Sequence, residues 1–233
     1  MFRIGILGAA DIAFNKFIPA LMKVEGVECA GVASNSPDKL KRFVEKYNVH
    51  VYSSYNEVIG DDSVDCVYIP LPPAFHYEWA KKALLAGKHV FLEKPSTTSA
   101  DDTRELVGIA GEKGLVVQEN YMFQFHAQLK EIENLIASGE LGKLRLVRTS
   151  FGFPRRAEGD FRYVKELGGG TMMDNGGYTI KLIDMLLGES MRLVSSQLDY
   201  DEKTGIDIFG TAEFVNDDGV IAQAAFGMDC QYQ

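Results

Sequence analysis

The 233-residue sequence has few of the side chains that build disulfide or metal sites. Its three cysteines, Cys29, Cys66 and Cys230, are far apart and form no Cys-x-x-Cys motif, and its four histidines show no ligand spacing. These observations exclude a disulfide framework and predict no metal site. The cysteines are interpreted as small core residues in a reducing compartment. Internal repeats, low-complexity tracts and flexible linkers are also missing.

Long apolar runs and an excess of basic charge are missing as well. No run approaches the roughly 20 residues of a membrane span. Residues 4–14 have some character of a signal peptide, but Asp11 interrupts them and no small-residue cleavage site follows. The net charge is −9, from 24 basic and 33 acidic residues, which argues against a general nucleic-acid binder. The sequence therefore predicts a cytoplasmic protein with no membrane or nucleic-acid partner.

What is present is organised around the stretch Lys88–Pro95. An apolar run, predicted to be a strand over residues 88–92, ends in the charged pair Glu93-Lys94 and is stopped by Pro95. Ligands of open α/β sheets bind outside the carboxyl ends of the strands, so Lys94 is a candidate catalytic residue. A solubilising loop charge is the alternative for these residues alone.

The amino-terminal residues have the pattern of a dinucleotide-binding unit. Phe2–Leu7 is a buried-strand run, Gly8 supplies a tight turn, and Ala10 stands where a second glycine would admit a pyrophosphate. A helix is predicted to follow because apolar residues recur at helical spacing. These residues are Ala13, Phe17, Leu21 and Val24.

The second strand, Val27–Ala33, leads into a predicted helix over Pro37–Tyr47. An NAD-specific site would favour an acidic residue at the end of this strand. Instead, hydroxyls, an amide and two cations occur there, which suits a 2′-phosphate and favours NADP, with NAD possible. These residues are Ser34, Asn35, Ser36, Lys39 and Arg42.

Strands and helices continue to alternate up to about residue 120. Val64–Ile69 is a strand, a proline loop follows it as a wall for a cofactor, and a helix then ends at Gly87. A helix over 101–112 and a strand over 115–118 complete the pattern. Residues 1–121 are therefore predicted to form a doubly wound parallel sheet of Rossmann type.

Residues 122–233 have a different pattern. Helices are predicted over 129–138 and 172–187, the latter after a triple glycine, and strands over 144–153, 193–200, 207–215 and 220–226. A hairpin turn is expected at residues 216–219. This second domain is predicted to be α+β, with a mainly antiparallel open sheet.

The ordered motifs of the chain resemble the glucose-fructose oxidoreductase and inositol dehydrogenase family, Gfo/Idh/MocA, over the whole sequence. The resemblance implies hydride transfer between NAD(P) and a hydroxyl-bearing carbon of a sugar, cyclitol or diol, with Lys94 as the active-site lysine. The motifs are Gly8–Ala13, the proline loop with His76, Gly87–Pro95, Glu119–Phe123 and Gly168–Asp174.

The sequence departs from the family pattern after the triple glycine. Asp174 is kept, but Tyr178 replaces a common histidine and Lys181 a common aspartate. This arrangement resembles the dihydrodiol dehydrogenase and sugar-nucleotide ketoreductase branches. Gln124 and Ala127 replace residues often Arg and Pro, so substrate contacts there are not carried over. The chain is shorter than the family norm, and the second domain is expected to be incomplete.

Asp174 and Tyr178 are four residues apart on one helix and so share a face. A nearby ammonium would favour the phenolate, making Tyr178 the proton donor and acceptor, Lys94 the group that holds the substrate oxygen, and Asp174 the orienter. Lys94 as acid or base remains an alternative. Arg162 precedes the glycines and is a candidate for an anionic or polyol substrate.

The predicted site is therefore spread over both domains. A non-catalytic NAD(P)-binding regulator and a dimerisation subunit are the alternatives to a sugar or diol oxidoreductase. A homodimer or homotetramer is expected through the open carboxyl-terminal sheet. The predicted cofactor-binding residues are Gly8, Ala10, Asp11, Ile12, Ser34, Asn35, Lys39, Pro70, Leu71, Pro72, His76, Glu93, Lys94 and Asn120. The predicted substrate-binding residues are Tyr121, Arg162, Asp174 and Tyr178.

Overall fold

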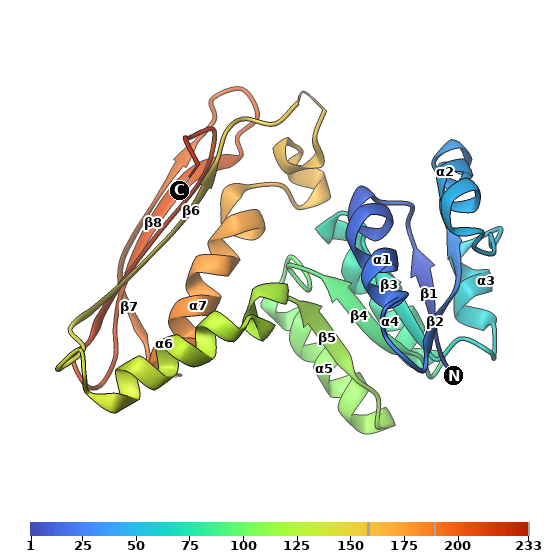
Figure 1. Cartoon of the computed structure of the whole chain (residues 1–233). Helices are drawn as coiled ribbons and strands as arrows, with labels where there is room; N and C mark the ends of the chain where they lie inside the picture. The colour runs from blue at the N-terminus through green and yellow to red at the C-terminus, as the bar shows by residue number, and fades with distance from the viewer. Residues whose placement is uncertain (158, 189, 233) are drawn as a thin grey trace. The chain divides into compact units, whose positions relative to one another are not determined.

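A computed structural model describes residues 1–157, 159–188 and 190–232 (Figure 1). The chain divides into two compact units, residues 1–120 and 121–233. The final residue of the predicted second domain, Gln233, lies outside the described residues.

The first unit is built on a five-stranded parallel sheet, which confirms the predicted Rossmann-type fold. The strand order is β2-β1-β3-β4-β5, with all four pairings parallel. The carboxyl ends of the strands therefore meet at one edge. The strands are β1 (Phe2–Leu7), β2 (Val27–Ala33), β3 (Cys66–Ile69), β4 (His89–Glu93) and β5 (Val117–Asn120).

Helices cover both faces of this sheet, each over its own buried apolar cluster. One face carries a π-helical turn (Ala13–Phe17) continued by α1 (Ile18–Leu21), together with α2 (Pro37–Tyr47). The other face carries α3 (Tyr55–Gly60), α4 (His76–Leu85) and α5 (Ala100–Lys113). The prediction that the first helix extends to Val24 was wrong, since Val24 lies beyond its end and is 53% exposed.

Helix α3 was not predicted, although its start carries a recognisable signal. Ser54 and Glu57 have the spacing of a capping box. The backbone N–H of Glu57 donates to Ser54 Oγ at 3.1 Å, whereas its carboxylate accepts from the backbone N–H of Ser53. Recognition of this S-x-x-E pattern would have located the helix that carries Tyr55.

Strand β4 lies one residue later than predicted, which places Glu93 inside the strand and Lys94 directly after it. Lys88 belongs to the opposite end, where its buried ammonium donates to the carbonyl oxygens of Asp61 and Val64. Strand β5 is also later than predicted, so Asn120 pairs with Glu93 across the sheet.

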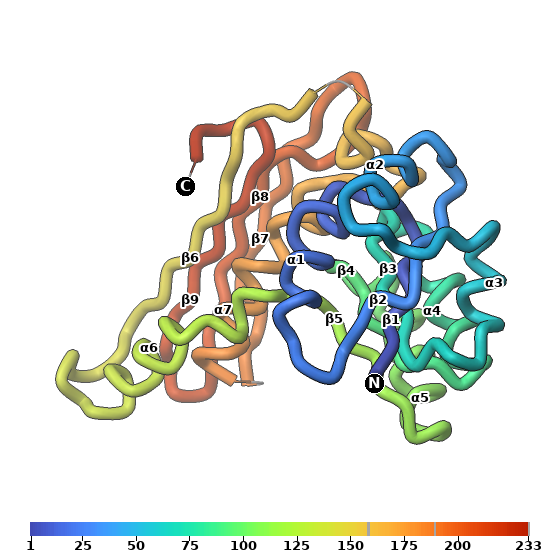
Figure 2. The backbone as a smooth tube through the Cα atoms, turned by 45° about the vertical axis from the view of Figure 1, so that its right-hand side comes forward, coloured from blue at the N-terminus to red at the C-terminus, as the bar shows by residue number. Residues whose placement is uncertain are grey.

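The second unit contains a four-stranded mixed sheet, ordered β6-β9-β8-β7. The two pairings of β8 are antiparallel, as predicted, while β6 and β9 form an unforeseen parallel pair. Figure 2 traces these strands. The elements are α6 (Ala127–Ser138), β6 (Leu146–Phe153), a π-helical turn (Met172–Gly176), α7 (Gly177–Leu187), β7 (Arg192–Tyr200), β8 (Asp207–Val215) and β9 (Ile221–Met228).

Asn175 joins the parallel pair to the helix that precedes α7. Its buried amide nitrogen donates to the carbonyl oxygens of Phe151 in β6 and Gly227 in β9, at 2.7 and 2.9 Å. Its amide oxygen accepts from the Thr171 hydroxyl. The helix that carries Asp174 and Tyr178 is thus fixed to the sheet by a satisfied polar group.

We expect Asn175→Ala to lower the free energy of unfolding by about 2–3 kcal/mol, because two buried carbonyls and a buried hydroxyl lose their partner. Urea unfolding followed by circular dichroism measures this change. The control is Lys130→Ala, which removes only an exposed ion pair with Glu133 and should change stability by less than about 0.5 kcal/mol. Equal stability of the two variants would contradict the assigned role.

Candidate functional site

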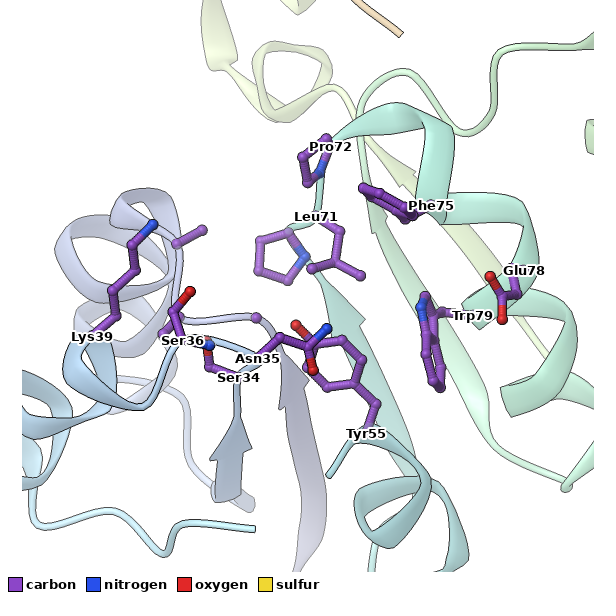
Figure 3. A pocket seen from close by; sticks show the side chains of 14 residues that line it. Ser34, Asn35, Ser36, Lys39, Tyr55, Leu71, Pro72, Phe75, Glu78 and Trp79 are labelled. Carbon is purple, nitrogen blue, oxygen red and sulfur yellow. The ribbon is translucent and has the colours of Figure 1, made fainter. Parts of the chain in front are cut away.

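A cavity of about 510 Å³ lies at the carboxyl edge of the first unit's sheet (Figure 3). One wall comes from the loops after β1 and β2, and the other from the loop after β3 and from α4. Most of the predicted cofactor residues line this cavity. They are Gly8, Ala10, Ser34, Asn35, Lys39, Pro70, Leu71 and Pro72.

Gly8 makes the turn at the base of the cavity possible. Its φ of +126° is accessible mainly to glycine, and its N–H donates to the Ala33 carbonyl oxygen at 2.9 Å. A methyl group at Gly8 would lie 2.9 Å from Leu71 Cδ2. The next residues enter the first helix, where Ile12 lies in the first turn and backbone N–H groups offer a site for a phosphate.

Asp11 and Arg42 connect this turn to α2. The guanidinium Nη1 lies 2.6 Å from Asp11 Oδ1, and Nη2 donates to the Ala9 carbonyl oxygen at 3.3 Å. A neighbouring cavity of about 360 Å³ is lined by both residues and by Lys39. Arg42 therefore has a defined task in holding the turn, while the exposed Lys39 lines both cavities.

The segment around Lys94 is anchored on both sides. Before it, Glu93 Oε1 accepts from the Tyr68 hydroxyl at 2.5 Å and from Asn120 Nδ2 at 2.7 Å. After it, the Ser96 N–H donates to Glu119 Oε1 at 2.7 Å. Anchors from β3 and β5 thus hold the half-buried Lys94 in a fixed place at the end of β4.

His76 supplies a further anchor. The ring is fully buried, with Nδ1 2.8 Å from the Pro95 carbonyl oxygen and Nε2 2.7 Å from that of Leu71. Burial lowers the pKa of His76, although the two backbone acceptors oppose this effect. The histidine therefore connects the cavity wall to the Lys94 segment. Sequence motifs located His76, Glu93 and Asn120 but did not indicate these contacts.

Tyr178 in the second unit lies within a group of aromatic rings. The Tyr121 and Phe151 rings meet it edge to face at 5.0 and 5.2 Å between centroids, and the Phe123 ring lies at 5.7 Å. Tyr121 is itself buried, with its hydroxyl so close to Gly177 that a β-carbon there would collide with it. These rings restrict the side-chain rotation of Tyr178, which is half-buried.

Asp174 and Arg162 form a partly buried ion pair in the same unit. Arg162 Nε donates to Asp174 Oδ2 at 2.7 Å, and its Nη1 lies 3.2 Å from Asp160 Oδ1. Burial opposes the charge of Arg162, but the two carboxylates prevail and raise its pKa. Arg162 was predicted to contact substrate; the structure gives it two carboxylate partners.

Within the described ranges, no group of three or more His, Cys, Asp and Glu residues is arranged to hold a metal ion. The three cysteines are unpaired. Burial raises the pKa of Cys29 to about 11 and that of Cys66 to about 12, so both remain thiols at neutral pH. No described helix combines the length and hydropathy needed to cross a membrane.

Comparison with known proteins identifies both units. Residues 2–121 match the oxidoreductase family with an NAD-binding Rossmann fold, and residues 129–233 match the GFO/IDH/MocA carboxyl-terminal domain. The chain belongs to the GFO/IDH/MocA oxidoreductase family. The predicted resemblance is thereby confirmed.

Two curated relatives and one solved structure are informative. The dTDP-3,4-didehydro-2,6-dideoxy-alpha-D-glucose 3-reductase of Actinomadura kijaniata is 36% identical over 99% of this chain and 69% of its own. The D-xylose 1-dehydrogenase (NADP(+)) 2 of Haloferax volcanii is 33% identical over 97% of this chain and 69% of its own. The 3-ketoreductase KijD10 from Actinomadura kijaniata, crystallised with NADP and TDP-benzene, has a TM-score of 0.96 and 36% identity, covering 99% of this chain and 71% of that chain.

The chain is an NAD(P)-dependent oxidoreductase, as predicted, with its Rossmann domain in the first unit. Membership of an enzyme family, together with relatives named as reductases and dehydrogenases, favours the enzyme over the two non-catalytic alternatives.

Proposed function

We propose that this protein uses NADPH to reduce a keto group on the sugar ring of a nucleoside-diphosphate sugar. The observation that carries the proposal is the 36% identity, along 99% of the chain, to a reductase whose named substrate is a dTDP-linked keto sugar. Tyr178, at the position that already suggested a ketoreductase, adds support.

A spectrophotometric assay at 340 nm tests the substrate class. We expect NADPH oxidation with dTDP-3,4-didehydro-2,6-dideoxy-α-D-glucose, and little NADP⁺ reduction with D-xylose or a trans-dihydrodiol. Preferred turnover of free xylose or of the diol would refute the nucleotide-sugar assignment while leaving the oxidoreductase assignment intact.

We propose that Ser34, Asn35 and Lys39 hold the 2′-phosphate that distinguishes NADP from NAD. The side chains of all three line the large cavity, and Lys39 also lines its neighbour. Ser34 Oγ accepts from the Ser36 N–H at 3.0 Å, which keeps the loop folded under the exposed lysine.

Lys39→Glu should weaken NADP binding by about tenfold or more while changing NAD binding less, since it replaces a cation by an anion beside a phosphate. Isothermal titration with both nucleotides measures the ratio. Lys41→Glu is the matched control, because Lys41 lies on the same helix but lines neither of the two cavities. Parallel losses for NADP and NAD in Lys39→Glu would refute the assignment.

We propose Lys94 and Tyr178 as the catalytic residues and Asp174 as an orienting residue. Bound NADPH supplies the hydride. Lys94 holds the substrate oxygen from its anchored segment, and the Tyr178 hydroxyl transfers the proton to or from that oxygen. Arg162 fixes the Asp174 carboxylate, so we assign it a positioning role. The related ketoreductase has been crystallised with a lysine and a tyrosine substituted in separate variants.

We also propose that two copies pair through the open face of the second unit's sheet. A polar row crosses this face: Arg148 Nε donates to Gln223 Oε1 at 2.9 Å, and Gln223 Nε2 donates to Glu213 Oε2 at 2.8 Å. A two-fold axis near Gln223 would place Arg148 of each copy beside Glu213 of the other.

Sedimentation velocity tests this pairing. The unmodified chain should sediment as a dimer, and Glu213→Arg should shift it toward monomer by opposing like charges. Glu202→Arg, in the exposed turn before β8, is the control and should remain dimeric. A monomeric unmodified chain, or a dimeric Glu213→Arg variant, would contradict the proposed interface.

A further inference from the structure

The large cavity has a second wall that the predicted cofactor residues do not explain. This wall contains Phe75, Glu78 and Trp79 from the start of α4 and the segment before it, with Tyr55 from α3 beside them. Figure 3 shows these side chains across the cavity from Ser34, Ser36 and Lys39. The cavity is therefore polar and cationic on one side and aromatic on the other.

Two neighbours hold the Trp79 ring in place. The Tyr55 ring meets it edge to face, with 4.9 Å between centroids and 85° between planes. The Lys82 ammonium lies 4.2 Å from the indole centroid and is itself paired with Glu78 at 2.7 Å. An indole fixed in this way loses little conformational entropy when a flat ligand packs against it.

Tyr55 ties the aromatic wall to the polar one. The phenol is buried, and burial raises its pKa against an opposing hydrogen bond with the Asn35 backbone. The residues that meet the 2′-phosphate and the residues that hold the indole are thus joined through one side chain. A ligand that spans the cavity contacts both walls of one connected structure.

The chemistry of the polar wall decides which base lies beside it. The 2′-phosphate of NADP is on the adenosine ribose, so the base next to Ser34 and Lys39 is adenine and not nicotinamide. Adenine is flat, uncharged and aromatic, and it stacks well on aromatic side chains. Resting on the proposed 2′-phosphate site, we infer that Trp79, supported by Tyr55 and Lys82, forms the adenine-binding wall.

The chain has a single tryptophan, so its emission reports on this wall alone. Adenosine 2′,5′-bisphosphate, which lacks nicotinamide, should change the Trp79 emission saturably, with the same Kd that calorimetry gives. Nicotinamide mononucleotide should not. Trp79→Leu should weaken binding of the bisphosphate at least about fivefold, the lower end of the range for a base stacked on an aromatic ring. Trp79→Phe should retain most of the affinity.

Tyr77→Leu is the matched control, because Tyr77 is a half-buried aromatic residue of α4 that packs on the same core without lining the cavity. It should change the Kd by less than twofold. Calorimetric binding with unchanged emission, a Trp79→Leu affinity within twofold of the parent, or binding of NADPH but not of the bisphosphate would each overturn the inference and leave the cofactor assignment standing. If nicotinamide fluorescence shows that NADPH does not bind either, the proposed function fails with it.

Discussion

Replacing Lys94 with methionine is expected to lower kcat/KM by about 10²- to 10⁴-fold or more, the range for loss of a group acting on the proton or oxygen of the reacting centre. Methionine keeps the length of the side chain but removes the charge. The anchors of the segment are supplied by Tyr68, Asn120 and Glu119, which the substitution leaves in place. The fold and the cofactor cavity should therefore survive.

Two measurements separate catalysis from folding in this variant. NADPH titration should give a Kd within a few-fold of the parent, and thermal unfolding should be similar. Lys113→Met, at the exposed carboxyl end of α5, is the matched control and should retain full activity. An active Lys94→Met enzyme would remove Lys94 from the mechanism, whatever its effect on stability.

Replacing Tyr178 with phenylalanine is expected to lower kcat by about 10²- to 10⁴-fold with a smaller change in KM, because only the proton-transferring hydroxyl is lost. The phenyl ring keeps the packing against Tyr121, Phe123 and Phe151. Stability should thus change little. Tyr200→Phe, on the exposed strand β7, serves as the control.

The two variants together decide which group transfers the proton. If Tyr178 does, the pH dependence of kcat seen in the parent enzyme should disappear in the residual activity of Tyr178→Phe. If Lys94 does, Tyr178→Phe should keep near-parental kcat and the same pH profile. The second result would reassign Tyr178 to positioning the substrate.

Local sequence patterns predicted much of the secondary structure correctly. The bounds of β2, α2 and β8 agree residue for residue with the predicted ranges. Alternation of strands and helices also gave the parallel sheet, because a right-handed crossover leaves few other arrangements. Helix α3 was missed because its capping residues were overlooked, not because the signal was weak.

Contacts between distant residues were beyond the reach of such patterns. The parallel pairing of β6 and β9 joins segments about 75 residues apart, as in the pair Arg148 and Gln223. The burial of His76 between the Leu71 and Pro95 carbonyls, and the commitment of Arg162 to Asp160 and Asp174, likewise depend on side-chain packing. Periodicity records which face a residue occupies and not which partner it meets.

The sequence by itself determined the Rossmann-type first unit, the family, and Lys94 and Tyr178 as candidates, because glycine turns, periodic apolar residues and short motifs are written locally in the chain. The tertiary structure alone showed that Lys94 lies between hydrogen-bonded anchors from β3 and β5, and that Trp79 faces Ser34 and Lys39 across one cavity. These arrangements arise only when strands far apart in sequence become neighbours in a sheet, since that pairing brings their terminal loops to a common edge.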